Sequence, residues 1–362
     1  MPKVMPPLRA NNNRCIASLS VRSRHLDRLA NDMNGCIPEM LKTNPDWMAL
    51  PDTDLRVLDT LWPILQPEFA RQLQTEKISL EQVESLASWV LPLAYRIRHQ
   101  QRLRGASIVI GINGAQGSGK STLCNLLTFL LGHCFQLKAC GFSLDDLYYS
   151  RSTRSKLAQD VHPLLQTRGV PGTHDIQLGL RLVKALERAG PLDETPIPVF
   201  DKAKDDRAPT SSWPICSGCC EVIIFEGWCV GSVSQNEAEL SEPLNSLEAL
   251  EDPDVIWRRY VNQILEQDYQ SLFSLIDVLV MLKAPSFDCV FNWRAEQEHK
   301  LRASLAEQGK PVSQQIMDDA ALQHFIANFQ RLTEHNLKHL PDKADLVYQL
   351  NETRQVIGLE NS

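Results

Sequence analysis

The sequence predicts an α/β fold in which helices cover both faces of a mainly parallel β-sheet. From Ser107 onward, short apolar runs rich in β-branched residues alternate with helical patterns. Such alternation is typical of parallel strands joined by helical crossovers. A glycine-rich motif joins the first apolar run to the helix after it. Because ligands of such sheets bind where the strands end, we expect a three-layer fold with its site at one edge.

Five apolar runs are the expected strands, namely residues 107–113, 137–144, 221–225, 276–282 and 345–350. The helical patterns between them include 121–131 and 176–188. Upstream, residues 47–104 carry apolar side chains at helical spacing, such as Leu58, Leu61 and Leu65. We interpret this stretch as a helical N-terminal segment packed on a main domain that spans 105–362.

The composition is ordinary for a globular protein, and the charge disfavours nucleic acid as a partner. The 362 residues are 43% apolar and carry a formal net charge of −7. An acidic chain lacks the basic surface that attracts phosphate backbones, so we expect no nucleic-acid partner. No apolar run approaches the roughly 18 residues that a membrane span needs, so we expect no membrane partner.

Ten cysteines occur along the chain, several of them inside apolar runs, such as Cys140 and Cys229. This placing is typical of buried, reduced thiols, so we expect a cytoplasmic protein rather than a disulfide framework. Cys216 and Cys219 form a C-x-x-C pair, but no second pair or close histidine pair completes a metal-ligand set. We interpret that pair as part of a loop before a buried strand.

Residues 1–46 are expected to form a disordered basic tail. The first 26 residues hold five Lys or Arg, three Ser and no acid. An organelle transit peptide has a similar composition and would place the protein in an organelle instead. Nothing in the segment marks a cleavage site, so we favour the tail.

The most specific motif is Gly114–Ser121, which fits G-x-x-x-x-G-K-[ST] in full. Glycines let backbone N–H groups turn toward phosphates, and the helix that follows adds its dipole. Lys120 is expected to reach the β- and γ-phosphates, and the Ser121 hydroxyl to ligate Mg²⁺. The predicted phosphate-binding residues are Gly114, Ala115, Gln116, Gly117, Ser118, Gly119, Lys120, Ser121 and Thr122. No Asn-Lys-x-Asp guanine-reading motif occurs in the chain, which favours ATP.

Two acids follow expected strands close to this motif. Asp145 ends the second strand, where it is well placed to take a proton from an attacking hydroxyl. Glu226 ends the third strand, where an acid can hold Mg²⁺ directly or through water. Either acid can instead cap a helix or be solvated, but their pairing with the phosphate motif favours catalysis.

Five motifs in this order resemble the D-glycerate 3-kinase family of plants and its bacterial and fungal relatives. They are the phosphate motif, S-x-D-D-x-Y at 143–148, R-G-x-x-G-[ST]-H-D at 168–175, F-E-G-W at 225–228 and W-R-x-x-x-E at 293–298. The resemblance covers roughly residues 105–351. It implies a P-loop kinase fold related to phosphoribulokinase, uridine kinase and pantothenate kinase, with D-glycerate as acceptor and 3-phosphoglycerate as product. Asp145 matches the acid that acts as base in this wider group.

The resemblance also implies residues for the acceptor side. Arg168, His174 and Asp175 belong to the segment before the acceptor-side helix, although Asp175 also suits that helix as its N-cap. Lys202 and Arg207 supply positive charge for a carboxylate. Arg294 lies in a lid expected near 291–303, where it would neutralise charge on the transferring phosphoryl group. A surface ion pair is the alternative for Arg294.

The function that these signals predict is an ATP- and Mg²⁺-dependent kinase of a small hydroxylated metabolite, most simply D-glycerate. The catalytic candidates are Lys120, Asp145, Glu226 and Arg294. A different small acceptor on the same fold is one alternative, because a few pocket residues decide which hydroxyl reacts. The other is an ATP-binding regulatory protein without kinase activity, which would have no need of a base.

Overall fold

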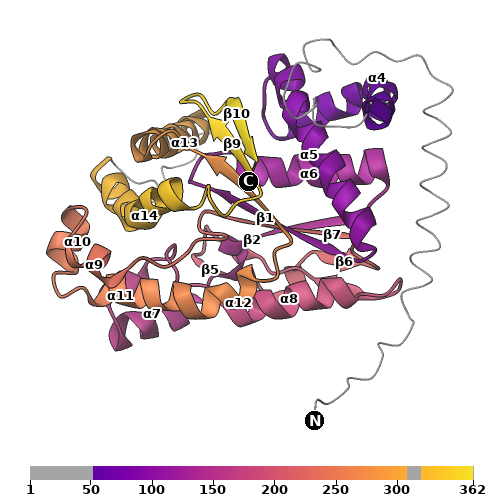
Figure 1. Ribbon diagram of the computed structural model, residues 1–362. Helices are drawn as coiled ribbons and strands as arrows, with labels where there is room; N and C mark the ends of the chain where they lie inside the picture. Colours follow the sequence, from indigo (N-terminus) through magenta and orange to yellow (C-terminus); the bar gives the residue numbers. More distant parts are fainter. Residues whose placement is uncertain (1–51, 308–318, 362) are drawn as a thin grey trace.

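The computed structural model describes residues 52–307 and 319–361 of the chain. A six-stranded sheet lies between two layers of helices, as Figure 1 shows. The predicted three-layer α/β fold with a mainly parallel sheet and an N-terminal helical segment is therefore confirmed.

The sheet has the strand order β10-β9-β8-β1-β7-β2, and all neighbours are parallel except β10 and β9. The strands are β1 (Ile108–Gly114), β2 (Ala139–Ser143), β7 (Val222–Gly227), β8 (Val278–Lys283), β9 (Leu346–Leu350) and β10 (Val356–Asn361). In this register Glu226 of β7 is opposite Ile112 of β1 and Ser143 of β2. The carboxyl ends of β1, β7 and β2 therefore meet at one edge.

Five of these strands lie within two residues of the bounds that the apolar runs predict. Strands β1 and β7 are buried at every position, as a central parallel strand should be. Strand β10 was not predicted, because it is an edge strand in which exposed residues such as Ile357 alternate with half-buried ones.

Helices cover the sheet on both faces. One layer contains α4 (Asp52–Thr75), α5 (Val83–Arg104), α6 (Lys120–Phe135) and α13 (Phe287–Glu307). The other contains α8 (Ile176–Arg188), a π-helical turn η5 (Leu265–Tyr269), α12 (Gln270–Phe273) and α14 (Asp319–His339). Side chains of β1 alternate between the layers, with Ile110 and Ile112 in the first core and Val109 in the second.

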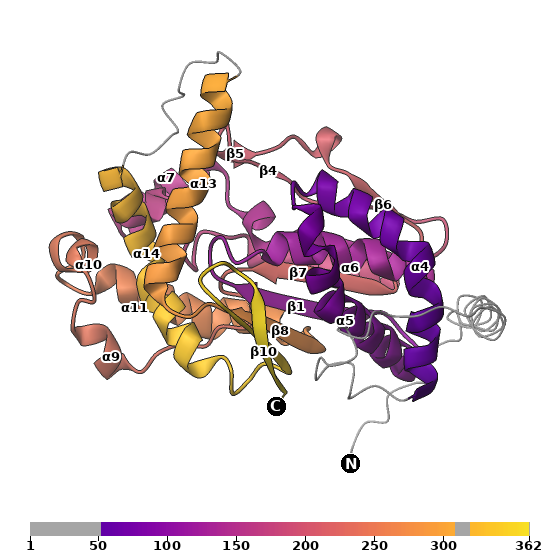
Figure 2. The same ribbon diagram turned by 90° about the horizontal axis from the view of Figure 1, so that it is seen from above.

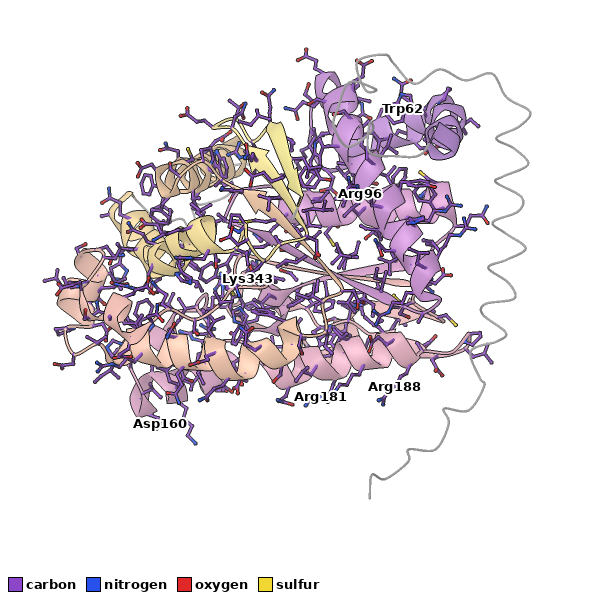
Figure 3. The ribbon with its side chains drawn as sticks, in the orientation of Figure 1. Trp62, Arg96, Asp160, Arg181, Arg188 and Lys343 are labelled. Atoms are coloured by element: carbon purple, nitrogen blue, oxygen red, sulfur yellow. The ribbon has the colours of Figure 1, made fainter. Side chains whose placement is uncertain are left out.

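In helix α8, the spacing of the apolar residues determines which face of the helix packs against the sheet. Ile176, Leu182 and Leu186 are buried against the sheet. Arg181 and Arg188 are exposed and project from the outer side of α8 in Figure 3. A stripe of apolar residues at helical spacing therefore seals the second core.

Shorter elements surround the acceptor side of the sheet. The helices are α7 (Arg151–Asp160), α9 (Glu237–Ser241), α10 (Ser246–Glu251) and α11 (Ile256–Ile264). The ribbons pair β3 (Glu194–Pro196) with β6 (Ile215–Ser217), and β4 (Phe200–Asp201) with β5 (Asp206–Arg207). The 3-10 turns are η1 (Leu80–Gln82), η2 (Leu144–Leu147), η3 (Pro163–Gln166) and η4 (Thr210–Ser212). Helix α13 projects beyond the body of the molecule in Figure 2.

The N-terminal helices share one apolar core with the sheet. Trp62 and Phe69 of α4, Trp89 of α5 and Tyr348 of β9 belong to the same buried cluster. The rings of Trp89 and Tyr348 have their centroids 4.9 Å apart. The boundaries at 46 and 104 stay predictions, and the tail expected over 1–46 lies outside the described residues.

Two further expectations concern the described part of the chain. Its eight cysteines are all free thiols, and seven of them are buried. Within the same residues, every helix is too short or too polar to cross a membrane.

Candidate active site

The phosphate loop runs from the end of β1 to the first turn of α6. Gly117 and Gly119 adopt left-handed φ angles of 79° and 93°. Residues other than glycine rarely adopt such angles. A Cβ atom on Gly117 would lie 2.8 Å from the Cβ of Trp293 in α13. The glycine spacing is therefore needed both for the loop conformation and for the close approach of α13.

Glu226 stands beside the loop at the end of β7. Its side chain is only 4% exposed. Glu226 Oε1 accepts a hydrogen bond of 2.7 Å from the Ser121 hydroxyl, whereas Oε2 is buried with no hydrogen-bond partner. A buried carboxylate oxygen without a partner, next to a hydroxyl, suits a hard divalent cation that prefers oxygen ligands.

Asp145 faces the same space from η2, the turn after β2. Its Oδ1 accepts from Tyr148 Oη at 3.0 Å, and its Oδ2 accepts from Lys202 Nζ at 2.8 Å. Burial acts to raise the pKa of Asp145, but the positive charges of Lys202 and Lys120 outweigh it and hold that pKa well below its ordinary range. The carboxylate is therefore ionised at neutral pH.

Asp146 has a different environment because β2 ends earlier than expected. Asp146 Oδ2 accepts from the Ser143 amide at 3.4 Å, and the Ser143 hydroxyl accepts from the Asp145 amide at 3.2 Å. This reciprocal cap turns the chain into η2 directly after Ser143. Asp146 Oδ1 also accepts from the Phe200 amide at 3.2 Å. Asp146 thus holds the turn that presents Asp145.

His174 lies behind Tyr148 rather than in the open cavity. Its ring stacks on Tyr148 with centroids 4.3 Å apart, and Nδ1 lies 2.5 Å from Tyr269 Oη. The side chain is 2% exposed, and burial lowers the pKa of His174 to about 3. A neutral imidazole therefore supports the tyrosine that hydrogen-bonds to Asp145.

The remaining acceptor-side candidates make contacts with protein groups. Asp175 caps α8 by accepting from the Leu178 amide at 2.9 Å, and Arg207 pairs with Asp175 at 3.4 Å. Arg168 pairs with Asp205. These residues shape the wall behind Tyr148, and a direct contact of Arg168, His174, Asp175 or Arg207 with an acceptor stays a prediction.

Arg294 enters the site from α13. Its half-buried side chain lines the same cavity as Lys120 and Asp145, and Nη1 donates to Gln297 Oε1 at 3.4 Å. The lid expected near 291–303 coincides with part of one continuous helix, of which side chains are described only to residue 297. Closure of that segment stays a prediction.

Three side chains near the phosphate loop make contacts that sequence reasoning did not predict, and one of them bonds to the loop itself. Arg354, in the turn between β9 and β10, donates to the Gly117 carbonyl at 3.0 Å and pairs with Glu296. Trp293 Nε1 donates to the carbonyl of Glu352 in the same turn at 2.6 Å. Asn113 of β1 donates to the Val230 carbonyl at 2.8 Å. Trp293 and Glu296 lie in the W-R-x-x-x-E motif, and Asn113 is the polar residue that ends an apolar run. No pattern near Arg354 indicates its contact.

Two cavities flank the phosphate loop. The larger, of about 550 Å³, is bordered by Lys120, Ser121, Asp145, Lys202, Glu226 and Arg294, together with most of the predicted phosphate-binding residues. The smaller, of about 450 Å³, lies between the loop, the segment 77–89 and the turn 353–356. Gly117, Gly119 and Thr122 border both cavities. All four catalytic candidates and Lys202 thus share one space.

Comparisons with known proteins find kinases among the relatives of this chain. An uncharacterized kinase of Schizosaccharomyces pombe is 35% identical over 217 residues, which is 58% of this chain and 76% of that kinase. The chloroplastic D-glycerate 3-kinase of Arabidopsis thaliana is 28% identical over 247 residues, 64% of this chain and 52% of that enzyme. A solved D-glycerate 3-kinase from Cryptococcus neoformans superposes with a TM-score of 0.62 at 27% identity, covering 75% of this chain and 99% of that one.

The chain belongs to the D-glycerate 3-kinase family of P-loop kinases. No protein-family model matches it. Membership in the D-glycerate 3-kinase family makes the chain a phosphotransferase with an alcohol group as acceptor. The resemblance drawn from the five motifs is thereby confirmed at the level of the family.

Proposed function

We propose that this chain transfers the γ-phosphate of ATP to the 3-hydroxyl of D-glycerate, giving 3-phosphoglycerate. The observation that carries the proposal is the placing of Asp145, ionised and bonded to Lys202, in the same cavity as Lys120 and the Ser121–Glu226 pair. The printed names of the Arabidopsis and Cryptococcus relatives supply the acceptor.

The two cavities support a nucleoside triphosphate as donor. A triphosphate lying along the loop would pass Gly117, Gly119 and Thr122, which border both spaces. Its nucleoside would occupy the smaller cavity, and its γ-phosphate would enter the larger one beside Lys120. Volumes of about 450 and 550 Å³ are within the usual range for such ligands.

Mg²⁺ fits the oxygen atoms of Ser121 and Glu226, which would hold it through the hydroxyl and the free Oε2. The ion would supply positive charge against the β- and γ-phosphates. Lys120 would bind the same phosphates, and Arg294 would face the transferring group from α13. These roles require no covalent intermediate, because phosphoryl transfer depends mainly on positioning and charge.

Lys202 would bind the carboxylate of glycerate. In the structure it pairs with Asp145 at 2.8 Å. A carboxylate that enters between them would take up one of the hydrogen bonds of the ammonium group and leave Asp145 beside the hydroxyl. The glycerate oxygen then bonds to the γ-phosphorus as the bond to the β-phosphate oxygen breaks, and the hydroxyl proton passes to Asp145.

The proposal is tested by ADP release in the presence of single acceptors. D-glycerate should stimulate release far above L-glycerate, other hydroxy acids, sugars, nucleosides and a sample without acceptor. Stimulation by one of the other compounds instead would identify a different acceptor on the same fold. A protein that binds ATP but is stimulated by none of them would be a regulatory ATP-binding protein.

A further inference from the structure

Three potential metal ligands meet outside the kinase cavities, between α9 and α14. His335 and His339 are four residues apart on α14, so their rings lie on the same face of the helix. One ligand atom each from Glu239, His335 and His339 lies within 4.8 Å of the other two. None of the three residues borders the cavities beside the phosphate loop.

His335 is the buried member of this cluster. Its side chain is 9% exposed, and its Nε2 atom is buried with no hydrogen-bond partner. The ring centroids of His335 and His339 are 4.5 Å apart. A buried ring nitrogen without a partner costs free energy. A metal ion bound through Nε2 would supply the missing bond.

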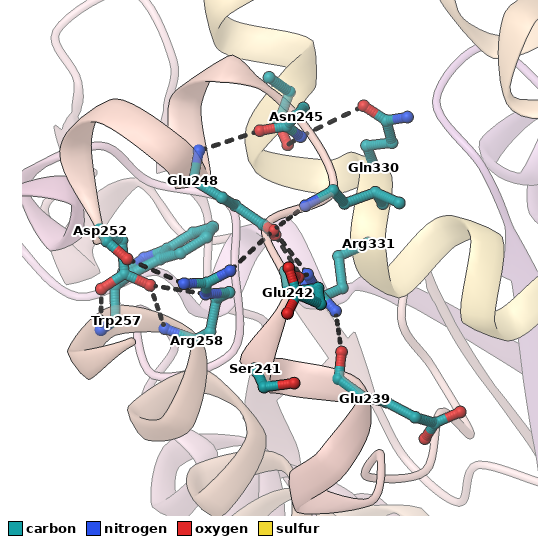
Figure 4. A network of polar contacts seen from close by, with 12 residues as sticks. Glu239, Ser241, Glu242, Asn245, Glu248, Asp252, Trp257, Arg258, Gln330 and Arg331 are labelled. Carbon is teal, nitrogen blue, oxygen red and sulfur yellow. Dashed lines mark hydrogen bonds and ion pairs between the residues drawn. The ribbon is translucent and has the colours of Figure 1, made fainter. Parts of the chain in front are cut away.

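Glu239 is held beside the histidines by two contacts. Arg331, one turn before His335 on α14, donates to the backbone carbonyl of Glu239 at 2.7 Å. Figure 4 shows this bond, with the Glu239 side chain directed away from Arg331. Glu239 Oε2 accepts from the Asn236 amide at 2.9 Å, which caps α9. The cap orients the carboxylate and leaves its second oxygen for an ion.

We infer that Glu239, His335 and His339 bind a divalent transition-metal ion such as Zn²⁺, with water as the fourth ligand. Two imidazoles and a carboxylate are a known three-ligand set for tetrahedral zinc. Zn–N bonds of about 2.0–2.1 Å place ligand atoms roughly 3.3 Å apart. The three ligand atoms lie within 4.8 Å of one another, so small side-chain movements would bring them to this separation.

The charges around the cluster permit a cation. Lys338 lies near His335, but its side chain is exposed to solvent. Arg331 is occupied by the Glu248 carboxylate, to which its Nη2 donates at 2.6 Å. The C-terminal end of α14 presents carbonyl groups that favour positive charge. A bound ion would tie α9 to α14.

The test is a calorimetric titration of metal-free, full-length protein with Zn²⁺ in the absence of nucleotide. We expect one equivalent to bind with micromolar affinity. His339→Ala should weaken that binding at least about tenfold, because it removes one of three protein ligands. The matched control is His324→Ala, on the same helix but bonded to Glu251. It should bind Zn²⁺ as the unchanged protein does.

Two further measurements are needed. One tests the site if His339→Ala folds poorly, and the other detects metal binding at a different site. Glu239→Gln keeps an oxygen for the cap but loses the charge, and it should also weaken Zn²⁺ binding at least about tenfold. Co²⁺ should show tetrahedral absorption bands without a sulfur-to-cobalt transition, since the cluster contains no cysteine. Unchanged affinity in both His339→Ala and Glu239→Gln, a sulfur-to-cobalt band, or no binding at micromolar Zn²⁺ would overturn the inference.

Discussion

At the residue scale, Asp145 and Asp146 are neighbours in the chain with opposite environments. Lys202 and Lys120 hold the pKa of Asp145 below its ordinary range. Burial raises the pKa of Asp146, even though the amides of Phe200 and Ser143 donate to it. Both carboxylates border the larger cavity, but Asp145 accepts from side chains whereas Asp146 accepts from backbone amides.

These environments predict different effects for the two amide variants. Asp145→Asn should lower kcat by about 10²–10⁴, because an amide cannot take the proton. Asp146→Asn should change kcat less and lower the free energy of unfolding, because one of its oxygen acceptors is replaced by a donor. Kinetics at saturating ATP and urea unfolding of both variants measure this. If Asp146→Asn has the lower kcat, Asp146 is the base and Asp145 is not.

His174 makes the stability of the fold depend on pH in a defined window. Its pKa is about 3 in the folded protein and about 6.5 in an unfolded chain. Between these values the unfolded state binds more protons, so the free energy of unfolding falls as the pH falls. His174→Gln cannot take up that proton. Its urea midpoint should therefore fall less between pH 7 and pH 5 than that of the unchanged protein. Equal falls would mean that His174 takes up a proton as readily in the folded protein as in the unfolded chain.

The sequence motifs predicted site residues that lie next to a strand end or a helix start. They did not predict residues that reach the site through contacts distant in the chain. Lys120, Ser121 and Asp145 follow from sequence order because a strand end and a helix start lie next to them. Arg354 contacts Gly117 across 237 positions of the chain. Such a contact depends on how β9 and β10 are placed, and no pattern near Arg354 indicates it.

At the element scale, η1 and the start of α5 form a wall of the smaller cavity. Gln82 borders that cavity, whereas its neighbour Glu81 does not. A bulky side chain at position 82 should exclude a nucleoside and leave the phosphate loop untouched. Gln82→Trp should therefore weaken ATP binding about tenfold or more without changing the binding of inorganic tripolyphosphate.

Glu81→Trp is the matched control and should change neither ligand. Fluorescence or calorimetric titration of the three proteins with both ligands gives the comparison. Equal weakening of ATP and tripolyphosphate by Gln82→Trp would mean that the variant disturbs the loop. Unchanged ATP binding would place the nucleoside elsewhere.

The predictability of the elements follows from how they are stabilised. Apolar runs predicted the central strands, because a strand that is buried on both faces is a continuous run of apolar residues. The end of β2 at Ser143 is determined by a reciprocal cap with Asp146, which the run 137–144 does not indicate. The two-residue strands β4 and β5 carry Lys202 toward the site through a turn, and strands so short have no periodicity to detect.

At the scale of the whole molecule, the N-terminal helices and the sheet form one core. Val90, Leu93 and Ile97 of α5 are buried in the same cluster as Ile110 of β1 and Leu127 of α6. Burying one such side chain stabilises a fold by about 1.5–3 kcal/mol, against a total stability of about 5–15 kcal/mol.

A fragment of residues 105–362 should therefore not fold alone. We expect it to lack a cooperative thermal transition and to bind a hydrophobic dye, whereas the full chain melts cooperatively. A fragment that melts within a few degrees of the full chain would show that α4 and α5 are dispensable for the fold.

In the proposed function, Lys120 and Asp145 act on ATP and D-glycerate in one cavity. The most direct measurement is phosphorus NMR of the product formed from ATP, Mg²⁺ and D-glycerate by the unchanged protein and by Lys120→Ala. We expect a 3-phosphoglycerate signal that grows as ATP is consumed, and loss of that signal in Lys120→Ala although the variant stays folded. A phosphate on the 2-hydroxyl, no phosphoglycerate at all, or equal rates in both proteins would contradict it.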